Sequence, residues 1–185
     1  LMGGVNWLTR PLLMAYCAML RASNIAPTTV GSFDPTRHTT RGDLIKTNKS
    51  LSVKLKWTKT RQNEDSVFVN FPVLTNVFLD PLRTLKAMDQ SAPPCKKSAP
   101  ALRFPSGAPL TSAFLNKAIK TLVTNQNLSA KGFSLHSFRR AAATAAAQGG
   151  ATGVQIAKQG TWNSPTYLSY VLTSPDLPSP VQQAF

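Results

Sequence analysis

The stretch that most constrains the fold runs from residue 133 to residue 171 and is built around a run of alanines. From Leu135 the alanine-rich pattern predicts a helix that ends at Gln148, because Gly149 and Gly150 follow directly. Alanine is among the residues most often fully buried, and its small side chain lets neighbouring helices approach closely. The sequence therefore predicts a mainly helical protein with this helix at its centre.

The same helix carries two polar side chains suited to binding an anion. His136 and Arg139 are three residues apart and so project from one face of the helix. A guanidinium fork beside an imidazole suits the oxygens of a phosphate. Farther along the chain, Tyr170 offers an oxygen nucleophile able to form a covalent phosphoryl intermediate. Together these residues predict phosphoryl-transfer chemistry.

The wording of these motifs resembles a known family. The segment His-Ser-Phe-Arg-Arg at 136–140, followed by Trp-x-Ser-x-x-x-x-x-Tyr from Trp162 to Tyr170, closely resembles the C-terminal signature of the tyrosine recombinases, the phage-integrase family. Within that family it looks most like the recombinases of eukaryotic Crypton-type and DIRS-type mobile elements. The family usually has His or Trp directly after the glycine that matches Gly160, whereas this chain has Thr161 and then Trp162.

The resemblance implies a fold and a reaction. The fold is an α+β, mainly α-helical catalytic domain with a small antiparallel β-hairpin or sheet at one edge. The reaction is site-specific DNA cleavage and rejoining through a 3′-phosphotyrosine, without metal, ATP or any other cofactor. The catalytic residues implied are Arg21, Lys59, His136, Arg139, Trp162 and Tyr170. Ser164-Pro165 is expected to open a helix that carries Tyr167 and Tyr170 on the same side. The family spacing from Trp162 selects Tyr170 as the nucleophile, and Tyr167 is expected to pack.

The charge balance independently favours a nucleic-acid partner. The sequence has 21 Lys and Arg against 7 Asp and Glu, a net charge of +14. Such a field attracts polyanions, and double-stranded DNA is the partner we expect. Half of that charge lies between residues 37 and 61, where eight basic residues face one acid. The expected DNA contacts are Arg37, Arg41, Lys46, Lys54, Lys56, Arg61, Lys117 and Arg140.

A β-hairpin is expected in this basic region. Apolar and polar residues alternate from Leu51 to Thr58, the pattern of a half-buried strand, and a second strand follows at 66–73. Lys59 lies at the turn, where the family carries a catalytic lysine. Lys56 is the competing candidate, although the alternation of the strand places it on a strand face and not in the turn.

The first catalytic arginine is assigned at the end of an apolar helix. Helical spacing of apolar residues predicts a helix over 7–22, ended before Pro27. An arginine at the end of a helix can also serve only as a solvated cap, because a cation interacts favourably with the helix C-terminus. The segment Leu20-Arg21-Ala22-Ser23-Asn24 is where the family carries its first catalytic arginine, although an acid more often occupies the position of Asn24.

The remaining segments have simpler patterns. A short helix is expected within 76–88, starting at Asp80-Pro81, and an irregular connection over 91–109. Residues 110–125 predict a helix capped by Thr111 or Ser112, with Phe114, Ile119 and Leu122 facing inward. A further short helix is expected over 151–159, ended by Gly160.

We expect residues 1–185 to form one catalytic domain cut from a longer protein, without the N-terminal core-binding domain of the family. The family resemblance implies a tetramer on DNA with exchange of C-terminal tails. Cys17 and Cys95 lack metal-ligand spacing, so no metal site is expected. Two reduced cysteines are the simpler interpretation, with a disulfide as the alternative, and they favour an intracellular location, for which the nucleus is expected. No membrane span is expected.

Two other functions remain open from the sequence. One is a domesticated copy that binds DNA without cutting it, for which Thr161 and Asn24 are the relevant departures. The other is a type IB topoisomerase, which shares the Arg, Lys, Arg, His and Tyr set.

Overall fold

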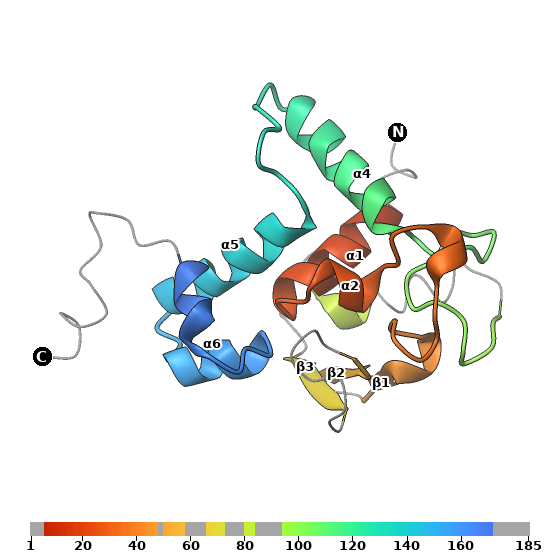
Figure 1. Cartoon of the computed structure of the whole chain (residues 1–185), viewed down its shortest axis with the longest axis horizontal. Helices are drawn as coiled ribbons and strands as arrows, with labels where there is room; N and C mark the ends of the chain where they lie inside the picture. Colours follow the sequence, from red (N-terminus) through yellow and green to blue (C-terminus); the bar gives the residue numbers. More distant parts are fainter. Residues whose placement is uncertain (1–5, 48–49, 58–65, 73–79, 84–93, 172–185) are drawn as a thin grey trace, which may run out of the picture.

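The computed structural model describes residues 6–47, 50–57, 66–72, 80–83 and 94–171 (Figure 1). The described helices are α1 (Asn6–Cys17), α2 (Ala22–Ile25), α4 (Ser112–Thr124), α5 (Leu135–Gln148) and α6 (Gly153–Gln159). The described strands are β1 (Leu44–Lys46), β2 (Ser50–Leu55) and β3 (Val67–Pro72), and there are 3-10 turns η1 (Val30–Ser32), η2 (Arg41–Asp43) and η3 (Pro165–Ser169). This mixture of helices with one small sheet confirms the predicted fold class.

The three strands form an antiparallel sheet in the order β1-β2-β3. The two strands of the predicted hairpin pair, with Leu51 opposite Phe71 and Val53 opposite Val69, and their turn lies outside the described residues. The first of them ends at Leu55 rather than at Thr58. The inward residues of β2 are buried and Ser52 and Lys54 are only half-buried, as the alternation indicated. Strand β1 was not predicted, and it pairs with β2 through Leu44 and Val53.

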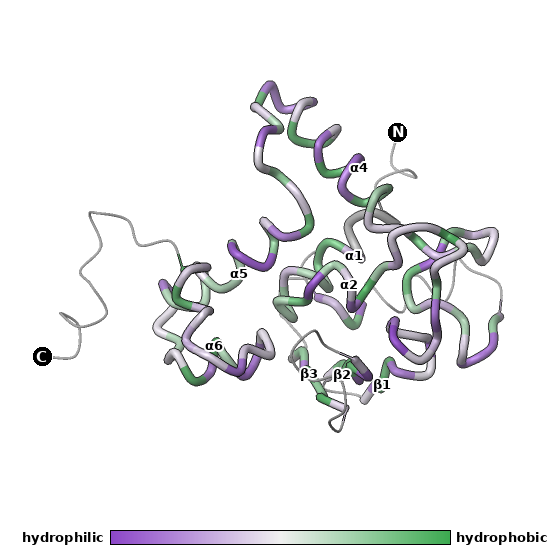
Figure 2. The backbone as a smooth tube through the Cα atoms, in the orientation of Figure 1, coloured by the Kyte–Doolittle hydropathy of each residue, from purple (hydrophilic) through white to green (hydrophobic). Residues whose placement is uncertain are grey.

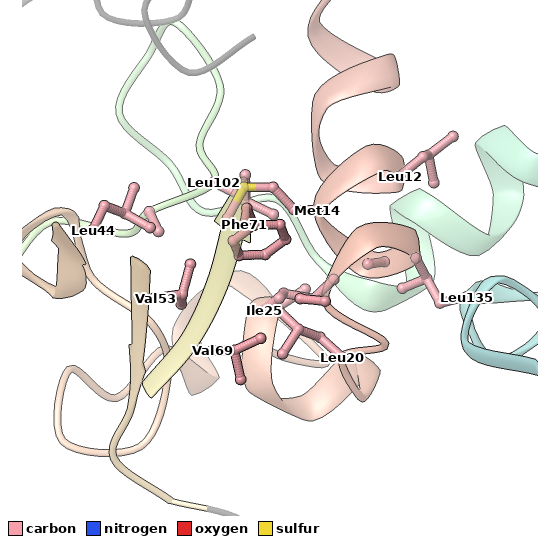
Figure 3. Close-up of a cluster of buried hydrophobic side chains, with 14 of the residues drawn as sticks. Leu12, Met14, Leu20, Ile25, Leu44, Val53, Val69, Phe71, Leu102 and Leu135 are labelled. Carbon is pink, nitrogen blue, oxygen red and sulfur yellow. The ribbon is translucent and has the colours of Figure 1, made fainter. Parts of the chain in front are cut away.

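The larger of two apolar clusters, here called the larger core, joins the sheet to α1, α2, α4 and the start of α5. Figure 3 shows Met14 of α1 beside Phe71 of β3 and Leu102 of the following connection. All three side chains are almost fully buried, at 1–2 % exposed. This cluster fixes α1, and therefore the chain that leaves it, against the sheet.

The second cluster, the smaller core, lies under the C-terminal half of α5, α6 and η3. Its buried members are Met19, Ala142, Ala143, Ile156 and Trp162. Figure 2 shows α5 changing from hydrophilic in its first turns to weakly apolar along its alanines. The prediction of a buried central helix holds only in part: Ala142 and Ala143 of α5 are buried, while Ala141 and Ala145 are exposed.

The first helix is shorter than its apolar pattern predicted. Helix α1 ends at Cys17 rather than at residue 22, because Met19 adopts a left-handed conformation with φ of 48°. The N–H of Leu20 then bonds back to the carbonyl of Ala15 at 3.1 Å, which closes the helix end. Arg21 therefore lies between α1 and α2 rather than inside a helix.

Four other expectations are refined, corrected or tested in part by the structure. Thr111, of the two candidate caps of α4, accepts a hydrogen bond from the N–H of Phe114 at 3.1 Å. Leu122 does not face inward, since 41 % of it is exposed. The segment after Ser164 is the 3-10 turn η3 rather than an α-helix, with Pro165 in its first turn as expected. Within the predicted helix at 76–88, only residues 80–83 are described, and 81–83 are helical.

Candidate active site

The site is organised around Arg139, which is 1 % exposed and lies on α5 between Leu135 of the larger core and Ala142 of the smaller core. Its Nη1 donates to the carbonyl oxygen of Met19 at the end of α1, and its Nη2 donates to the carbonyl of Gly160 at 2.7 Å. Its guanidinium carbon lies 3.7 Å from the ring centroid of Trp162, a close cation–π contact. The pKa of Arg139 is lowered to about 9, mainly by burial and also by the charge of Arg21, while Tyr170 opposes the shift, so the group is a cation at neutral pH.

Arg21 is the second cation of the site. It is half-buried, and its Nη1 is buried with no hydrogen-bond partner among the described residues. Burial lowers its pKa, and Tyr170 raises it. The Nε of Arg139 is likewise buried without such a partner. Two guanidiniums close enough to affect each other therefore each keep an unused N–H donor.

His136 lies one helical turn before Arg139 and faces the tyrosine, as the spacing predicted. Its ring stands edge-on to the ring of Tyr170, with centroids 5.1 Å apart and the planes at 61°. Its pKa is lowered, first by burial and then by the positive charges of Arg139, Arg140 and Arg21. The imidazole is therefore neutral at pH 7 in the DNA-free protein.

Tyr170 follows η3 and lies over the same cations. Its ring centroid is 5.2 Å from that of Trp162, and the guanidinium carbon of Arg139 is 5.7 Å from the ring. The hydroxyl of Thr144 on α5 donates to the Tyr170 carbonyl at 3.2 Å. The segment carrying the tyrosine is thus held to α5 of its own chain.

Tyr167 packs elsewhere, as expected. A Cβ built at Gly153 would lie 2.1 Å from the Tyr167 hydroxyl oxygen, so that oxygen occupies the space left by the glycine. This contact anchors η3 on the first turn of α6. It leaves Tyr170, rather than Tyr167, beside His136 and the two arginines.

Trp162 forms the apolar wall of the site and depends on a glycine that sequence reasoning treated only as a helix stop. Trp162 is 8 % exposed, and a Cβ at Gly160 would fall 1.8 Å from its ring. The signal available in the sequence was a glycine two places before a tryptophan at a helix end. The two backbone carbonyls that bind Arg139 had no such signal.

The hairpin side of the site is described only in part, because Lys59 and Arg61 lie outside the described residues. The strand that leads to them is tied to the site: Nδ2 of Asn24, which is 2 % exposed, donates to the carbonyl of Trp57 at 2.8 Å. An amide makes this bond where a carboxylate would lack the donor. Lys56, the competing lysine, forms an ion pair with Asp43 at 2.6 Å and donates to the carbonyl of Pro35.

The other predicted DNA contacts are spread over the surface. Arg37, Lys46, Lys117 and Arg140 are exposed, and Arg41 and Lys54 are half-buried. Arg37 lies over the Trp57 ring at 5.7 Å. Lys117 lines a hollow of about 520 Å³ along α4 with Lys120 and Asn116. Arg140 and Lys131 line another of about 260 Å³ beside the start of α5. Only Arg140 is adjacent in sequence to the site.

Two further observations concern other kinds of site. The described residues include no group of three or more His, Cys, Asp or Glu side chains placed to hold a metal ion. In the same part of the chain, no helix has the length and apolar character needed to cross a membrane.

Comparison with solved structures identifies the fold. The chain superimposes on the XerH site-specific recombinase bound to its palindromic difH substrate, with a TM-score of 0.66 over 92 % of this chain and 15 % sequence identity. It also matches the Tn1549 transposon integrase in complex with circular intermediate DNA, with a TM-score of 0.59, coverage of 90 % and 16 % identity. The chain has the fold of a tyrosine-recombinase catalytic domain.

The match covers 42 % of the XerH chain and 55 % of the Tn1549 integrase chain, so this chain spans about half the length of the proteins it resembles. No protein-family model and no curated protein sequence matches it. The predicted fold is confirmed by these comparisons.

Proposed function

We propose that this chain is the catalytic domain of a tyrosine recombinase that cuts and rejoins DNA through a phosphotyrosine. The observation that carries the proposal is the pair of guanidiniums of Arg139, which is buried, and Arg21, which is half-buried. Each keeps a buried N–H without a partner among the described residues, and each lies close enough to Tyr170 for its own pKa to be affected. Among the described residues, no acidic side chain contributes to the pKa of either arginine. Two cations held away from solvent in this way are suited to an anion that contacts both of them, and a DNA phosphate fits.

The chemistry follows from the geometry around Tyr170. The Tyr170 oxygen attacks the scissile phosphorus and loses its proton, the bond from phosphorus to the 5′-oxygen breaks, and a 3′-phosphotyrosyl link forms. Arg21 and Arg139 stabilise the charge that builds on the non-bridging oxygens in the pentacoordinate transition state. The 5′-hydroxyl of a partner strand reverses the step, so the energy of the phosphodiester bond is conserved.

Two proton transfers accompany this step. His136, neutral and in ring contact with Tyr170, accepts the phenolic proton or holds the phosphate. Lys59 protonates the 5′-oxygen that leaves, an assignment that comes from the family resemblance. Trp162 covers one side of Arg139 and keeps water away from it.

DNA binding is proposed for the basic surface that surrounds this site. Phosphate contacts from the cations predicted above would position the duplex without reading its sequence. Lys56 is the weakest member of that set, since Asp43 already neutralises it.

The proposal extends to the assembly of the protein on DNA and to the type of mobile element that encodes it. We propose that the domain acts as a tetramer on DNA, with exchange of C-terminal tails between subunits. An apolar groove of about 260 Å³ between α1, α4 and α5, lined by Tyr16, Leu122 and Phe138 among others, is open for such a segment. The motif wording further supports an element of the Crypton or DIRS type, and nuclear action.

The deciding experiment uses a library of DNA duplexes, each with a single nick and randomised sequence on both sides. A recombinase trapped by loss of the short strand beyond the nick leaves a covalent protein–DNA adduct. We expect adducts with the wild type and with Tyr167→Phe, and none with Tyr170→Phe, because only Tyr170 lies beside His136 and both arginines.

The same library separates the alternative functions. Binding of DNA with no adduct in the wild type would contradict an active enzyme and indicate a DNA-binding copy. Adducts without any preferred sequence, together with relaxation of supercoiled plasmid, would indicate a topoisomerase.

A further inference from the structure

Four helices of this chain end in the same way. Two or three residues beyond the end of each helix, one residue has a left-handed backbone: Met19 after α1, Asn127 after α4, Gly150 after α5 and Thr161 after α6, with φ of 48°, 57°, 83° and 56°. At each end the next N–H bonds back five residues, as from Trp162 to the carbonyl of Ala157 at 2.9 Å. This is the Schellman arrangement, which satisfies carbonyls at the end of a helix.

The residue types at these four ends fall into two groups. Gly150 and Asn127 are the residues that tolerate a left-handed backbone. Met19 and Thr161 are not, and for the β-branched Thr161 the conformation is strained. Such strain persists only where the surroundings enforce it, and it concentrates at functional sites.

The two strained ends are the ones that hold Arg139. The guanidinium donates to the carbonyl of Met19 itself and to the carbonyl of Gly160, the residue directly before Thr161. The C-terminal end of a helix carries a partial negative charge of about half an electron. Helices α1 and α6 therefore both direct negative ends at a buried cation that has no acidic partner in the part of the chain that the structure describes.

This arrangement connects the parts of the site. Arg21 follows Met19 by two residues, and Trp162 follows Thr161 directly. One guanidinium therefore links the segment that carries the first arginine to the segment that leads to Trp162 and η3. Gln159 adds a second link, since its side-chain amide donates to the carbonyl of Cys17 at 3.0 Å.

Building on the proposed function, we propose that Met19 and Thr161 are positioning residues, whose left-handed backbones aim two helix-end carbonyls at Arg139 and fix it before DNA binds. This carbonyl clamp, formed by the Met19 and Gly160 carbonyls, replaces the carboxylate that would otherwise orient the arginine. An acid there would neutralise the charge that the phosphate needs. Backbone carbonyls orient the guanidinium without that loss.

The test compares Thr161→Pro with Thr161→Gly in the DNA-free chain. Proline fixes φ near −65° and removes the N–H that bonds to Lys158, so it abolishes the left-handed end. Glycine retains that end. The matched control is Asn127→Pro, which breaks an equivalent end of α4 where no guanidinium is held. The readout is the NMR signal of the Arg139 Nη protons, assigned by its loss in Arg139→Lys.

In the wild type and in Thr161→Gly, we expect separate, slowly exchanging Nη signals, because two carbonyls hinder rotation of the guanidinium. Thr161→Pro should merge them, and Asn127→Pro should not. Adduct formation should fall about 100-fold in Thr161→Pro, the loss expected when a catalytic group moves by about 1 Å.

Several results would overturn the clamp. These are merged Nη signals in the wild type, unchanged signals in a folded Thr161→Pro, or equal loss in Asn127→Pro. If Thr161→Pro does not fold by circular dichroism, the wild-type spectrum decides alone. Because the NMR signals need no DNA, a chain that forms no adduct but shows the expected spectra retains the clamp and refutes the recombinase.

Discussion

The larger core and the smaller core of this protein differ in what holds them together. Among the described residues, the larger core contains twenty buried apolar residues from the sheet, four helices and the segments that connect them, whereas the smaller core contains five, two of them alanines. Yet Trp162 and Tyr170 belong to the smaller one, and Arg139 lies where the two meet. The candidate catalytic residues therefore lie in the smaller core, which has less apolar burial. Polar and cation–π contacts attach it to the better-packed larger core.

This comparison predicts that truncation inside the larger core mainly affects stability. Leu115 is completely buried on α4. Replacing it with alanine should lower the free energy of unfolding by about 2–5 kcal/mol, through lost burial and the cavity left behind. Urea unfolding measures the change. Below the unfolding transition, the adduct rate per folded molecule should stay at the wild-type value; a large loss there would show that the two regions are not separable.

Removing the Arg139 guanidinium should mainly affect the reaction rate. Arg139→Ala should reduce the rate of adduct formation by about 10²–10³-fold, because the transition-state charge loses a buried donor. The single-turnover rate with a nicked duplex measures it. Arg140→Ala is the control, as its side chain is exposed and one residue away. Equal losses in both variants would indicate a general loss of positive charge instead of a specific contact.

A methyl group at Gly160 should damage the smaller core selectively. The Cβ of Gly160→Ala would collide with the Trp162 ring and push the indole away from Arg139. Forced repacking of this kind costs about 1–3 kcal/mol, measurable by thermal or urea unfolding. Gly31→Ala, where a Cβ meets nothing within 4 Å, should leave stability nearly unchanged. A normal Trp162 fluorescence in Gly160→Ala would contradict the packing described.

The smallest predicted effect is a pH dependence from His136. Burial and three arginines lower its pKa below 6.5. If the neutral ring accepts the Tyr170 proton, the adduct rate should be level from neutral pH to 6.5 and fall as the pH drops through the lowered pKa. His136→Gln should remove that limb. A rate that rises on acidification would instead assign His136⁺ to holding the phosphate.

The same lowered pKa has a consequence for stability. The unfolded chain takes up the His136 proton at a higher pH than the folded chain does. Stability should therefore fall as the pH drops below 6.5, and by less in His136→Gln.

The features that the sequence predicted are local ones, and those that it missed depend on tertiary contacts. His136 and Arg139 were predicted to share a helix face because helical spacing is a local property, whereas the choice of Tyr170 over Tyr167 came from the family resemblance. The structure brings all three side chains together. The alternation of β2 was equally local. The three-residue strand β1 is too short to show such alternation, and its pairing with β2 depends on tertiary contacts.

The partners of Arg139 were beyond sequence reasoning for a physical reason. They are backbone carbonyls, one of them 120 residues away, and every residue carries a carbonyl. The left-handed conformations of Met19 and Thr161 were hidden because neither residue type suggests them. Helix α1 was predicted too long for the same cause, since nothing at Met19 signals an end.

The most direct test of a reaction centred on Arg139 is to map the residue that carries the DNA. The adduct from the nicked library is digested with nuclease and protease, and the linked peptide is identified by mass spectrometry. We predict a nucleotide remnant on Tyr170, with Tyr16 and Tyr167, the other tyrosines of the sequence, unmodified. A remnant on Tyr167, or on any serine, would contradict the site described.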